Sequence, residues 1–269
     1  MRDVTREPAP KHLLQFYEAD DGALVRNVGS YLAEGLRTGE GAIVAATPAH
    51  WTLFATHLRK AGLDVAALVA EGTLTYLDAD NALERILVGG YPDAARFDAI
   101  LGAAVRDALR SGERARVYGE LVNILWTRGQ YPAAIRLEQL WHRLLSALPF
   151  SLFCAYNIDV FDTGFDTGLL DALLRAHSHL LPSGCGDELV EALNAALQEV
   201  TGPNKASRIM LKAGDYSRRG WPSLPRTEAM ILWLRQHMPV EAPDVFRRAK
   251  ALYREKTAGE PIFSAESAG

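Results

Sequence analysis

The chain has 269 residues, with 29 lysines and arginines against 33 aspartates and glutamates, so its formal net charge is −4. Apolar residues make up 48% of it, enough for the core of one large domain or two smaller ones. Its two cysteines cannot build a disulfide framework, and no apolar run reaches the roughly 18 residues of a membrane helix. With no apolar leader segment either, we expect a soluble, cytoplasmic protein.

The first part of the chain alternates between helical and strand patterns. We expect a helix over 24–36, then a continuously apolar strand over 42–46, which is typical of a buried parallel sheet. Thr47 and Pro48 supply an N-cap and a first turn for a helix over 49–61. The remaining expected segments are strands at 73–77, 114–118 and 151–156, and helices at 80–87, 93–110, 120–126 and 132–148. This alternation predicts an α/β fold, a parallel β-sheet flanked by helices.

Glycines and prolines cluster at 162–168, directly after the last expected strand, so we divide the chain into domains 1–164 and 165–269. The first domain carries the whole net charge of −4, and the second is neutral. Apolar residues at three- and four-residue spacing predict that the second domain is an all-helical C-terminal extension. Its helices are expected at 169–181, 188–200, 205–213, 227–237 and 242–255.

Ligands of open parallel sheets bind beyond the carboxyl ends of the strands, so the residues after 42–46 are the first place to look for a site. A phosphate-binding loop would read GxxxxGK[ST] there. The chain instead reads Thr-Pro-Ala-His-Trp over 47–51, with neither the glycine loop nor the lysine. The start of that helix can still attract an anion. The sequence therefore argues against nucleotide hydrolysis by the usual route.

Two acidic residues, Asp78 and Glu120, end expected strands at the same edge of the sheet. Beside His50, they are candidates for contact with a ligand or for acid–base work. The structural alternative is that Asp78 caps the next helix, and that Glu120 neutralises the first turn of its own helix. The cap is favoured for Asp78, whereas Gly119 before Glu120 would let the backbone approach another group closely.

Several motifs are spread over about residues 10–161, and they read HLLQFYEAD at 12–20, ATPAH at 46–50, YPD at 91–93, YGELV at 118–122, LEQLW at 137–141 and FSLFCAY at 150–156. In these motifs the chain resembles the MEDS domain, the methanogen/methylotroph sensory domain. It departs from the family's usual residues at Leu121, where Met is common, and at His142, where Asn is common.

The resemblance implies a RecA-like domain that has lost the phosphate loop of related ATPases and senses small molecules in bacterial signal transduction or transcription regulation. The missing loop at 47–51 agrees with it. The resemblance identifies no ligand and no cofactor. Because the C-terminal region shows neither a kinase signature nor a convincing helix-turn-helix, we expect the signal to pass to a protein partner.

Eight residues are candidate ligand contacts, namely His12, Tyr17, Thr47, His50, Asp78, Glu120, Trp126 and Glu138. For His12, a core or capping role is the alternative to ligand contact. Glu138 lies on an apolar helical stripe, so its alternative is a structural ion pair with Arg116 or Arg136.

No metal ligands are assigned. His177 and His179 precede Cys185, but residues two apart point to different sides of a helix. Cys154 lies in an apolar strand and is expected to be an inert core thiol.

Residues 205–219 carry five lysines and arginines against one aspartate, and Trp221 follows them. Basic and aromatic residues together are found in nucleic-acid sites. A net charge of +4 over this stretch fits an acidic protein partner or a solvated helix face better.

The leading hypothesis is therefore a non-catalytic sensor that binds a small molecule near Thr47, His50, Asp78 and Glu120 and signals through its helices. An acidic sheet domain without a phosphate-loop lysine is poorly suited to bind a triphosphate. One alternative is an enzyme that uses Glu120, Asp78 and His50 as acid–base groups. Another is an adaptor that binds no ligand and forms homo-oligomers through its C-terminal helices.

Overall fold

The computed structural model describes residues 11–17, 21–159, 173–174, 176–181, 188–216 and 226–257. The chain divides into two compact units. The sheet unit comprises residues 1–158 and 166–183, and the helical unit comprises 159–165 and 184–269. Across the described ranges, none of the helices has both the length and the apolar character needed to span a membrane.

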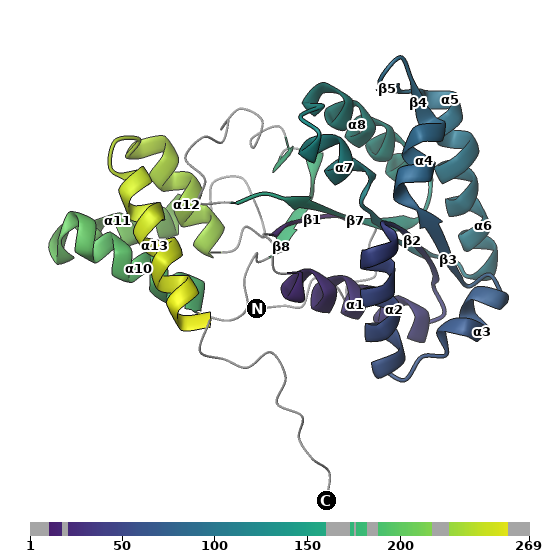
Figure 1. Cartoon of the computed structure of the whole chain (residues 1–269), viewed down its shortest axis with the longest axis horizontal. Helices are drawn as coiled ribbons and strands as arrows, with labels where there is room; N and C mark the ends of the chain where they lie inside the picture. Colours follow the sequence, from purple (N-terminus) through teal and green to yellow (C-terminus); the bar gives the residue numbers. More distant parts are fainter. Residues whose placement is uncertain are drawn as a thin grey trace, which may run out of the picture. The chain divides into compact units, whose positions relative to one another are not determined.

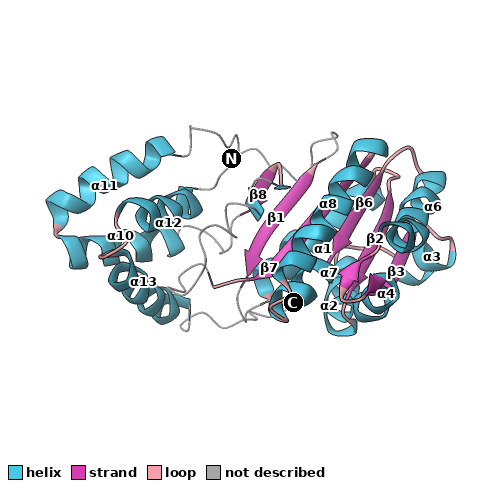
Figure 2. Cartoon of the chain, turned by 90° about the horizontal axis from the view of Figure 1, so that it is seen from above, coloured by secondary structure: helices cyan, strands magenta, loops and turns pink. Residues whose placement is uncertain are grey.

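The sheet unit is built on a six-stranded parallel sheet with the order β3-β2-β6-β7-β1-β8 (Figure 2). Its strands are β1 (His12–Tyr17), β2 (Gly41–Ala46), β3 (Leu74–Asp78), β6 (Ala115–Gly119), β7 (Phe150–Asn157) and β8 (His179–Leu181). All six residues of β2 are buried, because helices cover both faces of the sheet and leave no polar side to the strand. The α/β fold predicted from the alternating pattern is confirmed.

Helices lie on both faces of this sheet (Figure 1). They are α1 (Gly22–Arg37), α2 (Pro48–Lys60), α3 (Val65–Ala70), α4 (Ala79–Ile86), α5 (Ala94–Phe97), α6 (Ala103–Ser111), α7 (Leu121–Thr127) and α8 (Tyr131–Ala147). A π-helical turn, η1 (Asp98–Gly102), joins α5 to α6, and the hairpin strands β4 (Leu87–Val88) and β5 (Tyr91–Pro92) follow α4. Neither α3 nor the hairpin was expected from the sequence.

Local capping explains why two of these helices begin where they do. The Thr47 side chain accepts a hydrogen bond from the backbone N–H of His50, and Pro48 occupies the first turn of α2. Asp78 accepts from the backbone N–H of Asn81 at 3.0 Å and so caps α4. Both caps were predicted from the sequence.

The helical unit contains α10 (Glu188–Thr201), α11 (Pro203–Tyr216), α12 (Arg226–His237) and α13 (Ala242–Thr257). These four helices were all expected, and their apolar stripes meet in a core of their own. Its most deeply buried members include Leu193, Ala196, Leu197, Leu234, Val245, Phe246 and Ala249.

Two strands differ from the sequence interpretation. Residues 12–17 were placed before the first helix without a strand, whereas they form β1, buried throughout between β7 and β8. Residues 179–181 were assigned to a helix over 169–181 but form β8, which pairs with β1. A three-residue strand is too short to show a period of two, so its pairing with β1 decides the structure rather than the local pattern.

Candidate functional site

Polar side chains converge where β1, β2 and β6 end. Tyr17 is the last residue of β1, while Thr47 follows β2 and Glu120 follows β6. The strands are parallel, so these carboxyl ends share one edge of the sheet, and the Glu120 backbone N–H donates to Ala45 in β2 at 2.8 Å. Asp21, before α1, and His50, in the first turn of α2, complete what we call the strand-end site.

Glu120 is buried and reaches across to the start of α2. One carboxylate oxygen, Oε1, lies 2.6 Å from His50 Nδ1, and the other, Oε2, accepts from the Thr47 backbone N–H at 2.9 Å. Although Glu120 occupies the N-cap position of α7, its side chain forms no cap hydrogen bond there. The first-turn role considered for Glu120 is therefore replaced by a long-range contact with His50.

His50 is held between two acids. Its Nδ1 meets Glu120, and its Nε2 lies 3.3 Å from Asp21 Oδ2. Burial favours the neutral imidazole, but the hydrogen bonds and negative charges of Glu120 and Asp21 outweigh burial and raise the pKa of His50. The Asp21 side chain is 38% exposed, against 11% for His50, so Asp21 forms the open end of the site.

Asp21 and Asn123 were missed by sequence reasoning. Asp21 precedes α1, where an aspartate is ordinarily a helix cap, yet its side chain makes no cap hydrogen bond to α1. Asn123 donates to the Tyr17 hydroxyl at 2.9 Å, and its carbonyl oxygen accepts from the Asn157 backbone at 2.7 Å. The signal that could have found Asn123 is its position as one amide in the otherwise apolar run 121–126.

Tyr17 faces His50 edge-on, with 6.0 Å between the ring centroids. Burial, together with the negative charges of Glu120 and Asp21, raises the pKa of Tyr17 above its ordinary value. Its hydroxyl thus stays protonated and is held by side-chain hydrogen bonds to Asn123 and Asn157.

Four candidate residues lie outside this site. Asp78 ends β3 and caps α4, and within the described residues its side chain forms no hydrogen bond or ion pair with His50 or Glu120. Trp126 packs its ring against Tyr156, with centroids 5.3 Å apart. Glu138 belongs, with His12, to a second group of polar residues in the interior of the sheet unit.

This second group, the buried cluster, consists of His12, Glu138, Cys154 and His177, and all four are buried. They come from β1, α8, β7 and the segment before β8. His12 Nε2 lies 3.3 Å from Glu138 Oε2 and 3.4 Å from Cys154 Sγ, and His177 Nε2 lies 3.5 Å from Glu138 Oε1. Cys154 was expected to be an inert core thiol, but it contacts an imidazole instead.

Glu138 lies against two histidines and not against the arginines that were expected. Arg116 binds Glu40 at 3.1 Å, and Arg136 lies near Gln139. The carboxylate of Glu138 instead contacts the two histidines and accepts a short hydrogen bond from the Tyr156 hydroxyl. Burial alone would raise the pKa of Glu138, but His177, His12 and Tyr156 lower it to about 2.

Backbone carbonyls orient both imidazoles of the cluster. His12 Nδ1 lies 2.9 Å from the Ala176 carbonyl oxygen, and His177 Nδ1 lies 2.7 Å from that of Leu173. A carbonyl only accepts, so each Nδ1 carries the proton and each Nε2 faces the cluster. Burial lowers the pKa of His177 to about 4, and burial raises the pKa of the Cys154 thiol. The cluster thus offers two nitrogens, one sulfur and one carboxylate to a cation.

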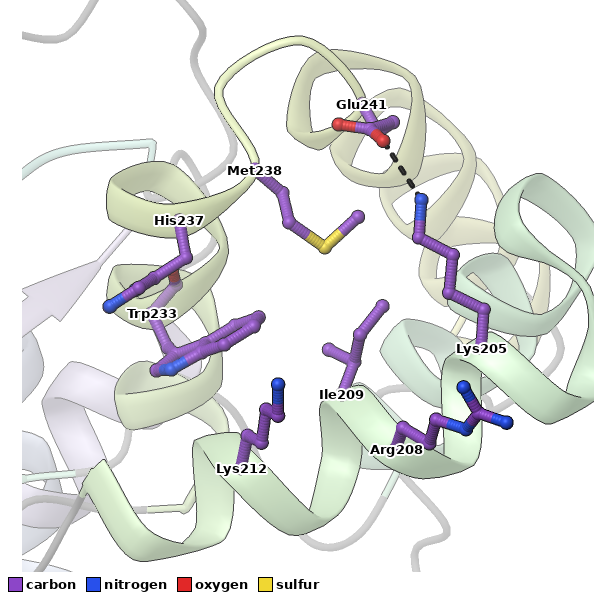
Figure 3. A pocket seen from close by; sticks show the side chains of 8 residues that line it. All are labelled: Lys205, Arg208, Ile209, Lys212, Trp233, His237, Met238 and Glu241. Atoms are coloured by element: carbon purple, nitrogen blue, oxygen red, sulfur yellow. Dashed lines mark hydrogen bonds and ion pairs between the residues drawn. The ribbon is translucent and has the colours of Figure 1, made fainter.

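The helical unit has a pocket of about 320 Å³, lined mainly by α11 and α12 (Figure 3). Its lining residues are Lys205, Arg208, Ile209, Lys212, Trp233, His237, Met238 and Glu241. Lys205 is bound to Glu241 at 3.0 Å. The three cations of α11 belong to the basic stretch noted in the sequence and are exposed, as a solvated face requires. Arg218, Arg219 and Trp221, from the same stretch, lie outside the described residues.

Comparison with known proteins identifies the sheet unit. A family model described as the methanogen/methylotroph, DcmR sensory domain (MEDS) matches residues 11–178, more than half of the chain. The matched range contains both the strand-end site and the buried cluster. No curated protein matches the chain. The resemblance noted in the sequence is thereby confirmed, and the chain belongs to the MEDS family.

Proposed function

We propose that this protein is a sensor that binds a small polar molecule at the strand-end site and passes on its occupancy through contacts with a protein partner. Membership of a sensory-domain family supports the regulatory role. The observation that carries the choice of site is the position of His50, held between Glu120 and Asp21 at the carboxyl edge of a parallel sheet.

Placing these three groups together costs free energy of folding, which suggests that the arrangement serves a function. Bringing a histidine and two acids together at a largely buried edge requires desolvation that an apolar replacement would avoid. Groups with perturbed pKa values therefore gather at functional sites. Counting an imidazolium as +1 and two carboxylates as −2, the site has a net charge of −1. This favours a ligand that donates hydrogen bonds or carries positive charge, such as a small alcohol or an amine.

The start of α2 supports a ligand other than a nucleotide. In phosphate-binding proteins the first backbone N–H groups of such a helix face an anion. Here Glu120 places its own carboxylate on the backbone N–H of Thr47. An incoming phosphate would meet this negative charge, and no phosphate-loop lysine is present to offset it.

We favour the pocket of the helical unit as the surface that contacts the partner protein. Arg208 and Lys212 lie on either side of Ile209 on α11, and Ile209 and Met238 give the pocket an apolar part. This combination suits an acidic segment of a partner protein. The adaptor alternative, in which the helices mediate oligomerisation without any ligand, predicts instead that no small molecule stabilises the protein.

Thermal unfolding in the presence of a panel of small alcohols, amines, carboxylic acids and nucleotides tests the site. A ligand that binds only the folded state stabilises it by RT ln(1 + [L]/Kd), so Tm rises with the logarithm of the ligand concentration once this exceeds Kd. We expect a hit among the alcohols or amines, lost in Glu120→Gln and kept in Glu84→Gln, since Glu84 is exposed on α4. A hit that survives Glu120→Gln unchanged would place the ligand elsewhere.

An enzyme is the second candidate, and one observation favours it. A separation of 2.6 Å between His50 Nδ1 and Glu120 Oε1 is that of a general base and the acid that orients it. The panel distinguishes the two candidates. If the protein is a sensor, a compound that raises Tm is recovered unchanged after incubation with it. If the protein is an enzyme, it converts the compound to a product, and Glu120→Gln stops this conversion.

A further inference from the structure

We infer that the buried cluster of His12, Glu138, Cys154 and His177 binds a divalent transition-metal ion, and that Zn²⁺ is the best match. This inference is independent of the strand-end site, with which the cluster shares no residue.

The donor atoms of the cluster are spaced as the ligands of a metal ion are. One donor atom from each of the four residues lies within 4.8 Å of the others. His12 Nε2 lies 3.3 Å from Glu138 Oε2 and 3.4 Å from Cys154 Sγ. Tetrahedral zinc, with ligands at about 2.0–2.3 Å, holds them roughly 3.3–3.8 Å from one another. An ion therefore fits among these atoms with only small adjustments.

Both imidazoles of the cluster are oriented as metal ligands. The Nδ1 protons of both histidines are committed to backbone carbonyls, those of Ala176 and Leu173. Metal-ligating histidines are held in this way, with one ring N–H bonded to a carbonyl or carboxylate and the other nitrogen free to ligate. The two Nε2 atoms lie 3.3 Å and 3.5 Å from the Glu138 carboxylate, so both are directed to the same small volume.

Two polar atoms of the cluster have unsatisfied hydrogen-bonding capacity. Glu138 Oε2 and His177 Nε2 are buried and lack a hydrogen-bond partner. Among the described residues, no lysine or arginine contacts the Glu138 carboxylate. A buried carboxylate and an inward-facing nitrogen lone pair carry a desolvation cost that a cation between them would offset.

The donor set selects the metal. Two imidazole nitrogens, one thiolate and one carboxylate suit borderline ions such as Zn²⁺, whereas Mg²⁺ and Ca²⁺ prefer oxygen alone. Four protein ligands in a buried position leave no place for a bound water, as in structural zinc sites. Binding would convert the Cys154 thiol to a thiolate and release its proton to solvent.

A structural ion here would cross-link elements that are far apart in the chain. His12 belongs to β1 and Cys154 to β7, while His177 directly precedes the edge strand β8. The ion would thus fasten the segment that leads into β8 to the centre of the sheet. Metal binding should therefore stabilise the whole sheet unit rather than a single loop.

The test is metal analysis of the full chain, followed by substitution with Co²⁺. We expect one zinc ion per chain as purified, and a thiolate-to-cobalt charge-transfer band after exchange. The band should be lost in Cys154→Ser and kept in Cys185→Ser, which removes the other cysteine of the chain. Glu120→Gln should also keep it, so a failure of the strand-end site leaves this result unaffected.

Two results would overturn the inference. One is folded wild-type protein that takes up neither Zn²⁺ nor Co²⁺ in stoichiometric amount and gains no thermal stability from either. The other is a charge-transfer band that persists in Cys154→Ser. If Cys154→Ser fails to fold, His177→Gln replaces it, with loss of stoichiometric zinc as the expected result and full retention as the contradicting one.

Discussion

The imidazole of His50 and the carboxylate of Glu120 meet at 2.6 Å although 70 positions separate them in the chain. The contact exists because β2 and β6 are neighbours in the sheet, and the two residues lie just beyond the carboxyl ends of these strands. It ties the first turn of α2 to the segment between β6 and α7, so both the charge state and the stability of this edge depend on it.

The charge on His50 predicts a pH-dependent stability. Its pKa in the folded protein is raised above the ordinary 6.5, so the folded state holds this proton more tightly than the unfolded chain does. The resulting stability is complete below pH 6.5 and is lost as the pH rises through the raised pKa. Urea unfolding of wild type and His50→Gln should show a larger difference at pH 6 than at pH 9. An equal difference at both would contradict the prediction.

Removing the Glu120 side chain should destabilise the protein. Glu120→Ala leaves the Thr47 backbone N–H and His50 Nδ1 without their buried acceptor, for an expected cost of about 2–3 kcal/mol. Glu120→Gln keeps an acceptor oxygen but removes the charge, so it should cost less and lower the pKa of His50 measured by NMR. The exposed control Glu84→Gln should lie within about 0.5 kcal/mol of wild type.

Two ion pairs of the sheet unit should differ in strength. Arg116 is buried, donating to Glu40 at 3.1 Å and to the Tyr31 carbonyl at 2.7 Å, so Glu40→Ala leaves a buried guanidinium only partly paired. We expect a loss of about 3 kcal/mol in the free energy of unfolding. Asp98 and Arg106 form an exposed pair, and Asp98→Ala should cost less than about 1 kcal/mol. Chemical denaturation compares the two, and equal losses would contradict the prediction.

The same substitution at two strand glycines should have opposite outcomes. A Cβ added at Gly41 would lie 2.4 Å from the Ala108 carbonyl oxygen, which belongs to the backbone of α6 and cannot rotate away. We expect Gly41→Ala to cost about 1–3 kcal/mol. At Gly119 the nearest atom, on Leu152, would be 3.6 Å away, an ordinary contact. Gly119→Ala should retain the wild-type Tm, and the close approach expected there from the sequence is absent.

The sheet and its helices were largely predictable because their signals are local. The apolar run 42–46 and the cap formed by Thr47 and Pro48 each lie within a few residues, and the structure has them as predicted. The edge of the sheet where Glu120 and His50 meet followed from the rule that parallel strands end together. Asp21 was not predicted as a residue of the strand-end site because an aspartate before a helix has a simpler local explanation as a cap.

The buried cluster was not predictable for the opposite reason. Its residues come from β1, α8, β7 and the segment before β8, and no short spacing connects them. His177 was considered with His179 on an expected helix, where two-residue spacing argues against a shared ion. The chain instead enters β8 at His179, and His177 turns inward toward His12. Only the pairing of β1 with both β7 and β8 brings Cys154 and His177 next to the side chain of His12.

β1 acts as a spacer of fixed length between the two polar groups of the sheet unit. Its first residue, His12, belongs to the buried cluster, and its last, Tyr17, belongs to the strand-end site. At about 3.3 Å per residue, the strand holds them roughly 17 Å apart. Neighbours on both edges prevent β1 from slipping, since a shift by one residue would turn every side chain to the opposite face. A change that displaces β1 at one end must therefore be accommodated at the other.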